Sequence, residues 1–293
     1  MIAFNFNIHF QDELLLDDGI YDNTKEHIHI IQSKDPNLFE TLSICSEYLP
    51  LSGREARYCA QKVYGECKGE CWWAVDVKDV MILLWQYGTD IIEYIPKDKM
   101  TPELLQFWVL HTILPMKLAL EATYDILHVG AVEVAGVTIV FSAESFGGKS
   151  TMTDYFIKQG HILLSDDTLG VYKKDDTFMA AASYPFHRPY REAESLGYKV
   201  TNIATEPKPV KALFLLAKGA PDANIEIIEV KGIQKYRAFH FSTFINFDFM
   251  KEQRFKRLST MAQSIPVYKV TVPWDIKRLP EVYKAITKYV SSM

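Results

Sequence analysis

One short stretch, SAESFGGKSTM at residues 142–152, constrains the fold of this 293-residue chain more than any other. Apolar and β-branched residues precede it at Val137–Phe141, and a helical pattern follows it at Ser150–Gln159. A glycine-rich turn between a strand and a helix can wrap backbone amides around a phosphate, and the helix dipole adds to the attraction. The stretch therefore predicts an α/β fold with an anion-binding loop at the end of a strand.

The end of this stretch has the residue types that a nucleotide-binding loop needs. Lys149 can reach the β- and γ-phosphates, and the hydroxyl of Ser150 can hold Mg²⁺. Ala143 stands where the motif has its first glycine. The candidate nucleotide-binding residues are Ser145, Phe146, Gly147, Gly148, Lys149, Ser150 and Thr151. The alternative is a glycine-rich turn that binds nothing.

Two adjacent carboxylates follow the next predicted strand. The segment His161–Ser165 is short and apolar, and Asp166 and Asp167 come directly after it. Phosphoryl transfer needs a carboxylate for Mg²⁺ and benefits from a second one near the acceptor hydroxyl. The pair therefore favours a phosphotransferase, with an Asp-Asp turn on the surface as the alternative.

These features together resemble one known family. Residues 127–171 look like the catalytic domain of HPr kinase/phosphorylase, and more closely like HprK-like serine kinases such as those that phosphorylate lasso-peptide precursors. That family has a histidine before a hairpin, a G-x-S-G-x-G-K-S loop, and then a GH…DD pattern. The matching positions are His128, Ser145, Gly148, Lys149, Ser150, Gly160, His161, Asp166 and Asp167.

The resemblance implies an α/β P-loop kinase domain of the HPr kinase/PEP-carboxykinase-like type, preceded by a small N-terminal α+β domain. It implies that Asp166 is the base, that Ser150 and Asp167 hold Mg²⁺, and that Lys149 and His128 take part in catalysis. ATP and Mg²⁺ are the implied substrate and cofactor. A buried histidine satisfied by backbone groups is the alternative for His128.

The chain departs from the family pattern in three ways. Ala143 and Phe146 replace family glycines. The acidic, glycine-rich segment linked to phosphorylase activity has no counterpart, so phosphorolysis is not expected. The N-terminal part is unlike that of the true HPr kinases, so HPr is not expected as the acceptor.

Composition excludes several other classes of protein. The apolar fraction of 48% and charged fraction of 24% are typical of a globular chain, and the net charge of −5 disfavours nucleic acid or an anionic membrane as partner. The longest apolar segment, Leu104–Leu120, is too short and too polar to span a bilayer. The N-terminus does not read as a signal peptide, so a cytoplasmic location is expected.

All four cysteines lie in the first quarter of the chain, at Cys45, Cys59, Cys67 and Cys71. The last two form a C-x3-C pattern, which is half of a zinc site, but no second pair follows at a suitable spacing. Reduced thiols are therefore expected.

Residues 1–97 are expected to form the α+β domain, and residues 98–293 the kinase-like domain. Strands are expected at Ile2–His9, His27–Gln32, Trp72–Val77, Val80–Trp85 and Asp90–Ile95, with a short helix at Pro36–Glu47. Thr101-Pro102 should open a helix that runs to about Ala122 and bends at Pro115. The polar segment Pro96–Lys99 is the expected boundary.

The second half of the chain should be mostly β-structure, followed by helices. Ala131–Val134 and Val137–Phe141 should form a hairpin at Ala135-Gly136. Further strands are expected at Gly170–Lys173, Phe178–Ala182, Lys211–Leu216 and Ile225–Val230, and helices within Phe247–Ala262 and Pro280–Tyr289.

Two more segments are candidates for binding the substrate. Arg188 and Arg191 in HRPYRE could clamp a phosphate or a carboxylate, although a solvated loop is an equal alternative. The aromatic run Phe239–Phe249 could line an acceptor site, but core packing is favoured.

The sequence therefore predicts a kinase that moves the γ-phosphate of ATP to a hydroxyl, with serine favoured, on a peptide, protein or small metabolite. A homo-oligomer is possible. Phe146 is expected to contact the nucleotide or the acceptor. The alternatives are a non-catalytic ATP-binding sensor or adaptor, which Ala143 and Phe146 motivate, and an ATP hydrolase.

Overall fold

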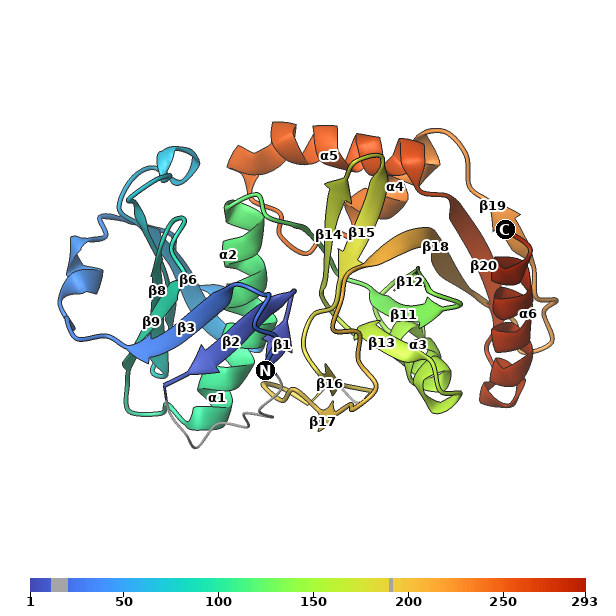
Figure 1. Cartoon of the computed structure of the whole chain (residues 1–293), viewed down its shortest axis with the longest axis horizontal. Helices are drawn as coiled ribbons and strands as arrows, with labels where there is room; N and C mark the ends of the chain where they lie inside the picture. Colours follow the sequence, from blue (N-terminus) through green and yellow to red (C-terminus); the bar gives the residue numbers. More distant parts are fainter. Residues whose placement is uncertain (12–20, 190–191) are drawn as a thin grey trace. The chain divides into compact units, whose positions relative to one another are not determined.

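The computed structural model describes residues 1–11, 21–189 and 192–293. The chain divides into two compact units (Figure 1). The first unit is Met1–Thr123 with Arg191–Leu196, and the second is Tyr124–Tyr190 with Gly197–Met293.

The first unit is built on a mixed β-sheet. It contains most of the predicted strands, but the single strand expected at Ile2–His9 is two antiparallel strands joined by a turn at Phe4-Asn5. Its strands are β1 (Ile2–Ala3), β2 (Phe6–Phe10), β3 (His27–Gln32), β4 (Ile44–Cys45), β5 (Leu49–Leu51), β6 (Arg54–Ala60), β7 (Trp72–Val77), β8 (Met81–Gln86) and β9 (Ile91–Pro96). The sheet order is β1-β2-β3-β9-β8-β7-β6-β4, with β5 also on β6. The β7–β8 hairpin turns at Lys78-Asp79, where Asp79 has a φ of 63°.

One helical segment of the first unit follows its sheet. It comprises α1 (Pro102–Phe107), the π-helical η3 (Trp108–Ile113) and α2 (Leu114–Leu120). The Thr101 hydroxyl accepts a hydrogen bond from the Leu104 amide at 3.3 Å, which confirms the predicted N-cap. The π-helical turns precede Pro115, whose missing N–H and bulky ring disturb a regular helix.

The structure corrects the boundary that we placed near residue 97. Every residue of η3 and α2 is buried, and the segment belongs to the first unit, whose longer stretch of chain ends at Thr123. Glu121 just after α2 accepts from the Gly88 amide at 2.9 Å. This hydrogen bond ties the end of the helical segment to the turn after β8.

The helix predicted at Pro36–Glu47 is wrong. The structure has a short 3-10 turn, η1 (Leu38–Thr41), followed by β4, and a second such turn, η2 (Tyr64–Glu66), lies after β6. The Asp35 side chain accepts from the Asn37 amide at 3.0 Å, a local turn that competes with a helix. Pairing of β4 with β6 then draws the segment into the sheet.

The four cysteines form two disulfides, Cys45–Cys59 and Cys67–Cys71, so the expectation of reduced thiols is wrong. Cys45 and Cys59 are directly opposed on β4 and β6, which brings their side chains together. Cys67 and Cys71 flank a tight turn in which the Cys71 amide donates to the Gly69 carbonyl. With their sulfurs bonded to each other, Cys67 and Cys71 cannot serve as a zinc half-site.

The second unit contains the strands and helices around the predicted loop. Its strands are β10 (Asp125–Leu127), β11 (Gly130–Val134), β12 (Val137–Ala143), β13 (Ile162–Ser165), β14 (Leu169–Lys174), β15 (Thr177–Ala181), β16 (Phe186–His187), β17 (Tyr198–Lys199), β18 (Lys208–Gly219), β19 (Ile227–Glu229) and β20 (Val267–Pro273). Its helices are α3 (Lys149–Lys158), α4 (Ile233–Phe241), η4 (Asp248–Met250), α5 (Lys251–Ser264), η5 (Ile276–Arg278) and α6 (Leu279–Ser291).

The main sheet of this unit has the order β10-β14-β15-β18-β12-β11-β13, with β20 also on β18 and β19 on β20. Strands β12, β18 and β20 run parallel, and β11 is antiparallel to both β12 and β13. The carboxyl ends of β12, β13, β18 and β20 therefore lie at one edge of the sheet. The amino end of β11 lies at that same edge.

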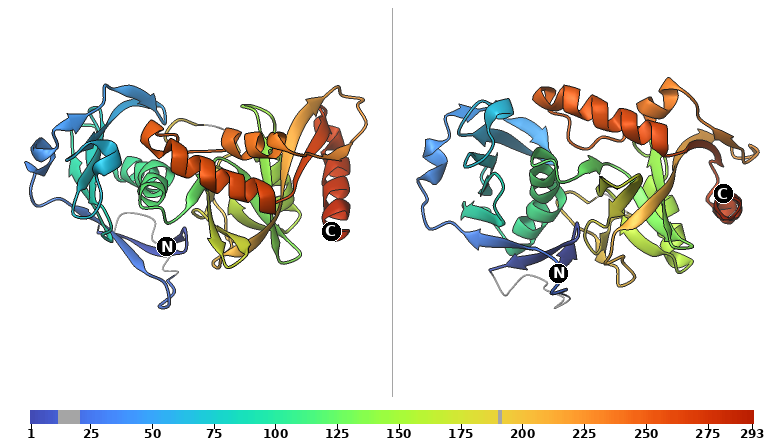
Figure 2. Two further views of the ribbon diagram at one scale, coloured as in Figure 1. Left: turned by 90° about the horizontal axis from the view of Figure 1, so that it is seen from above. Right: turned by 45° about the horizontal axis from the view of Figure 1, so that its top comes forward.

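Helices cover both faces of this sheet, because its strands carry apolar residues on alternating sides. Val140 and Leu213 pack with Phe239 and Met261 of α4 and α5. Their strand neighbours pack on the other face with α3 and α6, and this set includes Phe141, Phe214, Phe156 and Ile286. In Figure 1, α5 lies above the strands of this unit and α3 below them, and Figure 2 shows α5 and α6 from two further directions.

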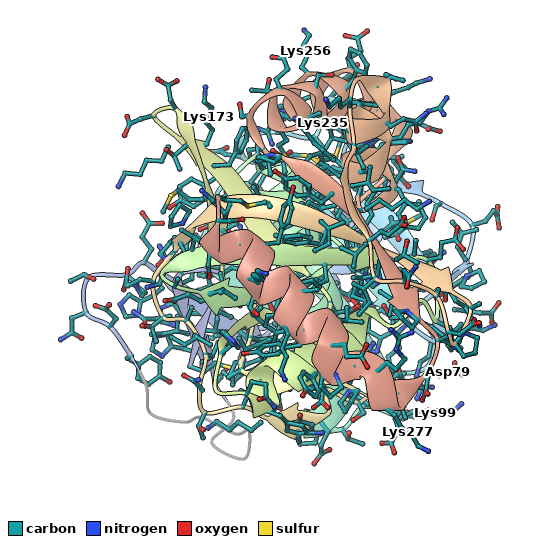
Figure 3. The ribbon with its side chains drawn as sticks, turned by 90° about the vertical axis from the view of Figure 1, so that its right-hand side faces the viewer. Asp79, Lys99, Lys173, Lys235, Lys256 and Lys277 are labelled. Atoms are coloured by element: carbon teal, nitrogen blue, oxygen red, sulfur yellow. A yellow bond between two sulfur atoms is a disulfide. The ribbon has the colours of Figure 1, made fainter. Side chains whose placement is uncertain are left out.

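The outer faces of these helices carry charged residues beside some exposed apolar ones, such as Phe255 of α5. Figure 3 shows Lys256 of α5 pointing outward. The second unit is thus a three-layer α/β structure, which agrees with the predicted fold class at the level of a mixed α/β unit. Within the described residues, no helix has the length and apolarity that a membrane crossing requires.

The two disulfides give a direct prediction. After unfolding without a reductant, no cysteine should react with a thiol-alkylating reagent, whereas prior reduction should make all four reactive. Closing a loop of this size, with a sequence separation of 14 between Cys45 and Cys59, stabilises a fold by roughly 3 kcal/mol. Reduction should therefore lower the Tm of the first unit. Four alkylated cysteines in the unreduced protein would contradict the pairing.

Candidate active site at the edge of the second sheet

The predicted loop lies between β12 and α3, in the order that the sequence indicated. The Gly147 amide donates to the Glu144 carbonyl at 2.8 Å, which closes a turn. A Cβ at Gly147 would come within 2.8 Å of the Glu144 oxygen, so this position admits only glycine. Gly148 caps α3 with a φ of 87°, a conformation that glycine adopts without strain.

Two residues replace glycines of the family pattern with different consequences. Ala143 ends β12 and is outside the set of residues with positive φ. Phe146 has a φ of 59°, which is costly for a bulky side chain, and its ring is 82% exposed. The loop thus holds a large aromatic side chain at its tip in a strained backbone conformation.

The start of α3 can receive an anion. Its N-cap residue is Gly148, which has no side chain to accept from the first amides of the helix. The first amides of a helix lack partners within the helix and carry the positive end of its dipole. Gly130 lets α3 approach the sheet here, since a Cβ at this position would overlap the Thr153 hydroxyl and contact Lys149 Cγ at 3.4 Å.

Lys149 and Asp167 meet at the sheet edge. Lys149 is buried, and its Nζ lies 3.4 Å from Asp167 Oδ1. His128, which precedes β11, has its Nδ1 3.0 Å from the same carboxylate oxygen and its Nε2 3.2 Å from Lys149 Nζ. Arg188 Nη2 lies 3.6 Å from the other oxygen, Oδ2. Three basic side chains thus surround one carboxylate.

The tautomer of His128 follows from these contacts. An ammonium group has only donors, so the nitrogen that faces Lys149 must be the one with a lone pair. We therefore assign the proton to Nδ1, which faces Asp167. The ring also stacks on Phe244 at a centroid distance of 6.2 Å, and the His128 amide donates to the Ser242 carbonyl at 2.6 Å.

Asp166 has a different environment from Asp167. Its side chain is 5% exposed, and its Oδ2 accepts from the Arg188 amide at 2.8 Å and lies 3.0 Å from His187 Nδ1. Burial opposes ionisation of Asp166, but His187, the Arg188 amide and Lys149 outweigh it, so the pKa lies below its ordinary value. Asp166 Oδ1 is buried and has no hydrogen-bond partner within the described part of the chain.

His187 links Asp166 to the helix after the loop. Its ring is completely buried, and its Nε2 lies 3.4 Å from Asp154 Oδ1 on α3. Tyr198 also donates to Asp154 Oδ1, at 3.0 Å. The sequence did not predict this role of His187, although the residue lies in the HRPYRE segment. The signal was a histidine next to Arg188, but only the fold brings it to Asp166.

The structure brings together some of the other predicted residues and separates others. Ser145, Phe146 and Thr151 are exposed along the loop and the start of α3, and Ser150 is partly buried. His161 lies at the opposite end of β13, where its Nε2 is 3.0 Å from the Tyr283 hydroxyl. Arg191 lies outside the described residues. In the aromatic run Phe239–Phe249, Phe239 packs in the core, which is the role that was favoured for this run. Phe244 instead lies beside His128.

A metal ion could be held by few protein ligands here. Among the described residues, no group of three or more His, Cys, Asp or Glu side chains is arranged to hold one. Mg²⁺ sites in phosphoryl-transfer proteins use one or two carboxylates, with substrate phosphates and water completing the shell. Ser150 and the two aspartates are the donors at this edge.

Comparison with known proteins gives limited information. No protein-family model matches the sequence, and no curated protein matches it. The chain is similar to a solved structure described as the Hpr(Ser) kinase/phosphatase from Coxiella burnetii, at 14% identity and a TM-score of 0.33. The match covers 56% of this chain and 94% of that chain. A likeness at this level does not assign an activity.

The environment of Asp166 predicts an acid dependence of stability. The pKa of Asp166 is lower in the folded state than in the unfolded state, so as the pH falls the unfolded chain binds the proton first. The contribution of ionised Asp166 to the free energy of unfolding is therefore complete above the ordinary pKa of about 4 and is lost as the pH falls from there to the lower folded pKa. Asp166→Asn should flatten this part of the curve of unfolding free energy against pH, measured by urea denaturation. Asp176→Asn, at a fully exposed position, is the matched control. Equal acid slopes in wild type and Asp166→Asn would refute the assignment.

Proposed function

We propose that the second unit transfers the γ-phosphate of ATP to a hydroxyl group, with serine as the favoured acceptor. The observation that carries this proposal is the 3.4 Å approach of Lys149, at the start of α3, to Asp167, at the end of β13. A cation and a carboxylate beside a helix N-terminus are what phosphoryl transfer uses to hold a phosphate and to orient its acceptor. The sequence resemblance to HprK-like serine kinases supports the same class of reaction.

In this proposal, the loop and α3 hold the phosphate chain. Backbone amides from Phe146 to Ser150 surround the β-phosphate, and Lys149 donates to oxygens of the β- and γ-phosphates. The Lys149 side chain is buried and already held in place. It therefore needs to move little when negative charge develops on the leaving oxygen.

The residues present fit a magnesium ion. The buried Oδ1 of Asp166, which has no hydrogen-bond partner within the described part of the chain, offers a carboxylate oxygen, and Ser150 offers a hydroxyl. When bound with ATP, the ion neutralises charge on the phosphate oxygens. We therefore place Asp166 and Ser150 at the metal. The resemblance implied Asp167 in place of Asp166, and Ser150 is common to both assignments.

Asp167 then takes the acceptor side. His128 Nδ1 and Lys149 orient its carboxylate, which is well placed to take the proton of an incoming hydroxyl. The hydroxyl oxygen forms a bond to the γ-phosphorus, the bond to the β–γ bridging oxygen breaks, and ADP leaves with that electron pair. Arg188, 3.6 Å from Asp167, can balance charge on the transferring group.

Two other activities use the same site. An ATP hydrolase would place water where the acceptor hydroxyl belongs, and a sensor would bind ATP without turnover. The strained Phe146 in the loop motivates the sensor. A pair of carboxylates next to Lys149 favours transfer, because a protein that only binds nucleotide has no need of a base.

The proposal is tested by incubating the whole chain with γ-labelled ATP, Mg²⁺ and a serine-containing peptide library. We expect label on peptides, and slow phosphate release to water when peptides are left out. Lys149→Ala should lower the transfer rate roughly 10²–10³-fold, as does loss of a donor to a transition-state oxyanion. Asp167→Asn should lower it roughly 10²–10⁴-fold, as does loss of a general base.

Matched controls are available on the β14–β15 hairpin. Lys173 points outward in Figure 3, and Asp176 is fully exposed, so Lys173→Ala and Asp176→Asn should transfer phosphate at the wild-type rate. Tight ATP binding with neither peptide labelling nor phosphate release would favour the sensor. Phosphate release that is fast and unchanged by every peptide would favour the hydrolase.

Phe146→Gly tests the residue at the tip of the loop. Glycine removes the left-handed strain of roughly 1–2 kcal/mol, but its unfolded state is more flexible by about 0.5–1 kcal/mol, so the Tm should change little. If the exposed ring contacts a ligand, the KM for ATP or for the peptide should change at least severalfold. Phe255→Ala, exposed on α5, is the control. Unchanged KM values for both substrates would remove Phe146 from the site.

A further inference from the structure

A cavity of about 230 Å³ adjoins the phosphate-binding loop. Its walls are mostly apolar, and the residues that matter here are Gly148, Thr151, Met152, Leu216, Trp274 and Leu279. Pockets that enclose a whole drug-sized ligand measure roughly 300–1,000 Å³. This cavity therefore suits one flat, uncharged part of a ligand whose remainder lies outside it.

The cavity lies at the edge of the sheet that carries the candidate active site. Leu216 lies near the carboxyl end of β18, and Trp274 follows β20 directly. Since β12, β18 and β20 are parallel, their carboxyl ends share this edge with the loop. Ligands of open α/β sheets bind at such an edge.

The start of α3 separates the cavity from Asp167. Lys149 points to Asp167, whereas Thr151 lines the cavity. Residues two apart on a helix point roughly 200° away from each other, so the two side chains leave the helix on opposite sides. A triphosphate bound across this N-terminus therefore has two distinct ends, one at Asp167 and the other at the cavity.

Trp274 forms a flat wall beside the loop. Its indole is close enough to Gly148 that a Cβ there would lie 3.5 Å from the ring. Lys218 Nζ lies 4.3 Å from the ring centroid, which fixes the indole by a cation–π contact on one face. The ring is still 40% exposed. A large aromatic side chain exposed next to a phosphate-binding loop is suited to stack on a base.

We propose that this cavity binds the base of the nucleotide, with Trp274 as its stacking surface. The inference rests on the proposed function, because it needs the loop to hold the phosphates. The base occupies the apolar cavity, the α-phosphate lies by Thr151, and the γ-phosphate points to Asp167. The apolar lining of the cavity excludes the reverse orientation of the nucleotide, because that orientation would bury charged phosphates among Met152, Leu216 and Leu279.

The test compares ATP with inorganic triphosphate, which has the phosphates and lacks the base. Binding of each to the whole chain is measured by calorimetry with Mg²⁺ present. Wild type should bind ATP at least tenfold more tightly, and Trp274→Ala should lose roughly tenfold or more for ATP, as expected for one stacked base. Its affinity for triphosphate should stay the same. Trp274→Phe keeps an aromatic face and should retain most of the ATP affinity.

Fluorescence gives a second readout that does not depend on affinity. The chain has five tryptophans, and the other four, Trp72, Trp73, Trp85 and Trp108, belong to the first unit. ATP should quench the emission of wild type, triphosphate should not, and Trp274→Phe should bind ATP with the quenching largely lost. Phe255→Ala, another exposed aromatic truncation, should behave as wild type in both assays.

The outcomes separate this inference from the proposed function. Equal wild-type affinities for ATP and triphosphate, or full ATP affinity in a folded Trp274→Ala, would overturn the base site and leave the phosphotransferase proposal standing. If wild type bound neither ligand, both proposals would fall. A Tm equal to that of wild type verifies that each variant is folded.

Discussion

The antiparallel pairing of β11 with both β12 and β13 is the constraint on which the candidate site depends. Because β11 runs against its two neighbours, its amino end lies beside their carboxyl ends. His128 precedes β11, the glycine-rich loop follows β12, and the aspartates follow β13, so one pairing pattern collects groups from three places in the chain. Gly130, at the start of β11, then allows α3 to approach closely enough for Lys149 to reach the same edge.

Charge explains how two neighbouring carboxylates are held at this edge of the sheet. Lys149, His128 and Arg188 surround Asp167, and His187 and the Arg188 amide hold Asp166. Both carboxylates, the buried Asp166 and the partly buried Asp167, therefore have donors or cations beside them, which offset the cost of removing them from water. A nucleotide phosphate would share the cations that now face Asp167, and this sharing is how binding and acceptor activation are coupled in our proposal.

The local sequence pattern was sufficient to predict the strands and the helix around the glycine-rich loop. The hairpin at Ala135-Gly136, the strand before the aspartates and the helix after the loop follow from alternation, glycine and helical spacing, and the structure has all of them. The pattern did not reveal what depends on distant contacts: the Cys45–Cys59 pairing, the helix that belongs to the first unit, and the approach of His187 to Asp166. Trp274 was also missed, although its position just after a buried parallel strand is a usable signal for a ligand site.

The most direct test of the account is a crystal structure of the whole chain with Mg²⁺ and a non-hydrolysable ATP analogue. The account predicts the β-phosphate within hydrogen-bond distance of the amides from Phe146 to Ser150, the γ-phosphate between Lys149 and Asp167, and the base against Trp274. An analogue bound elsewhere on the chain, or a loop whose amides turn away from the phosphates, would contradict it.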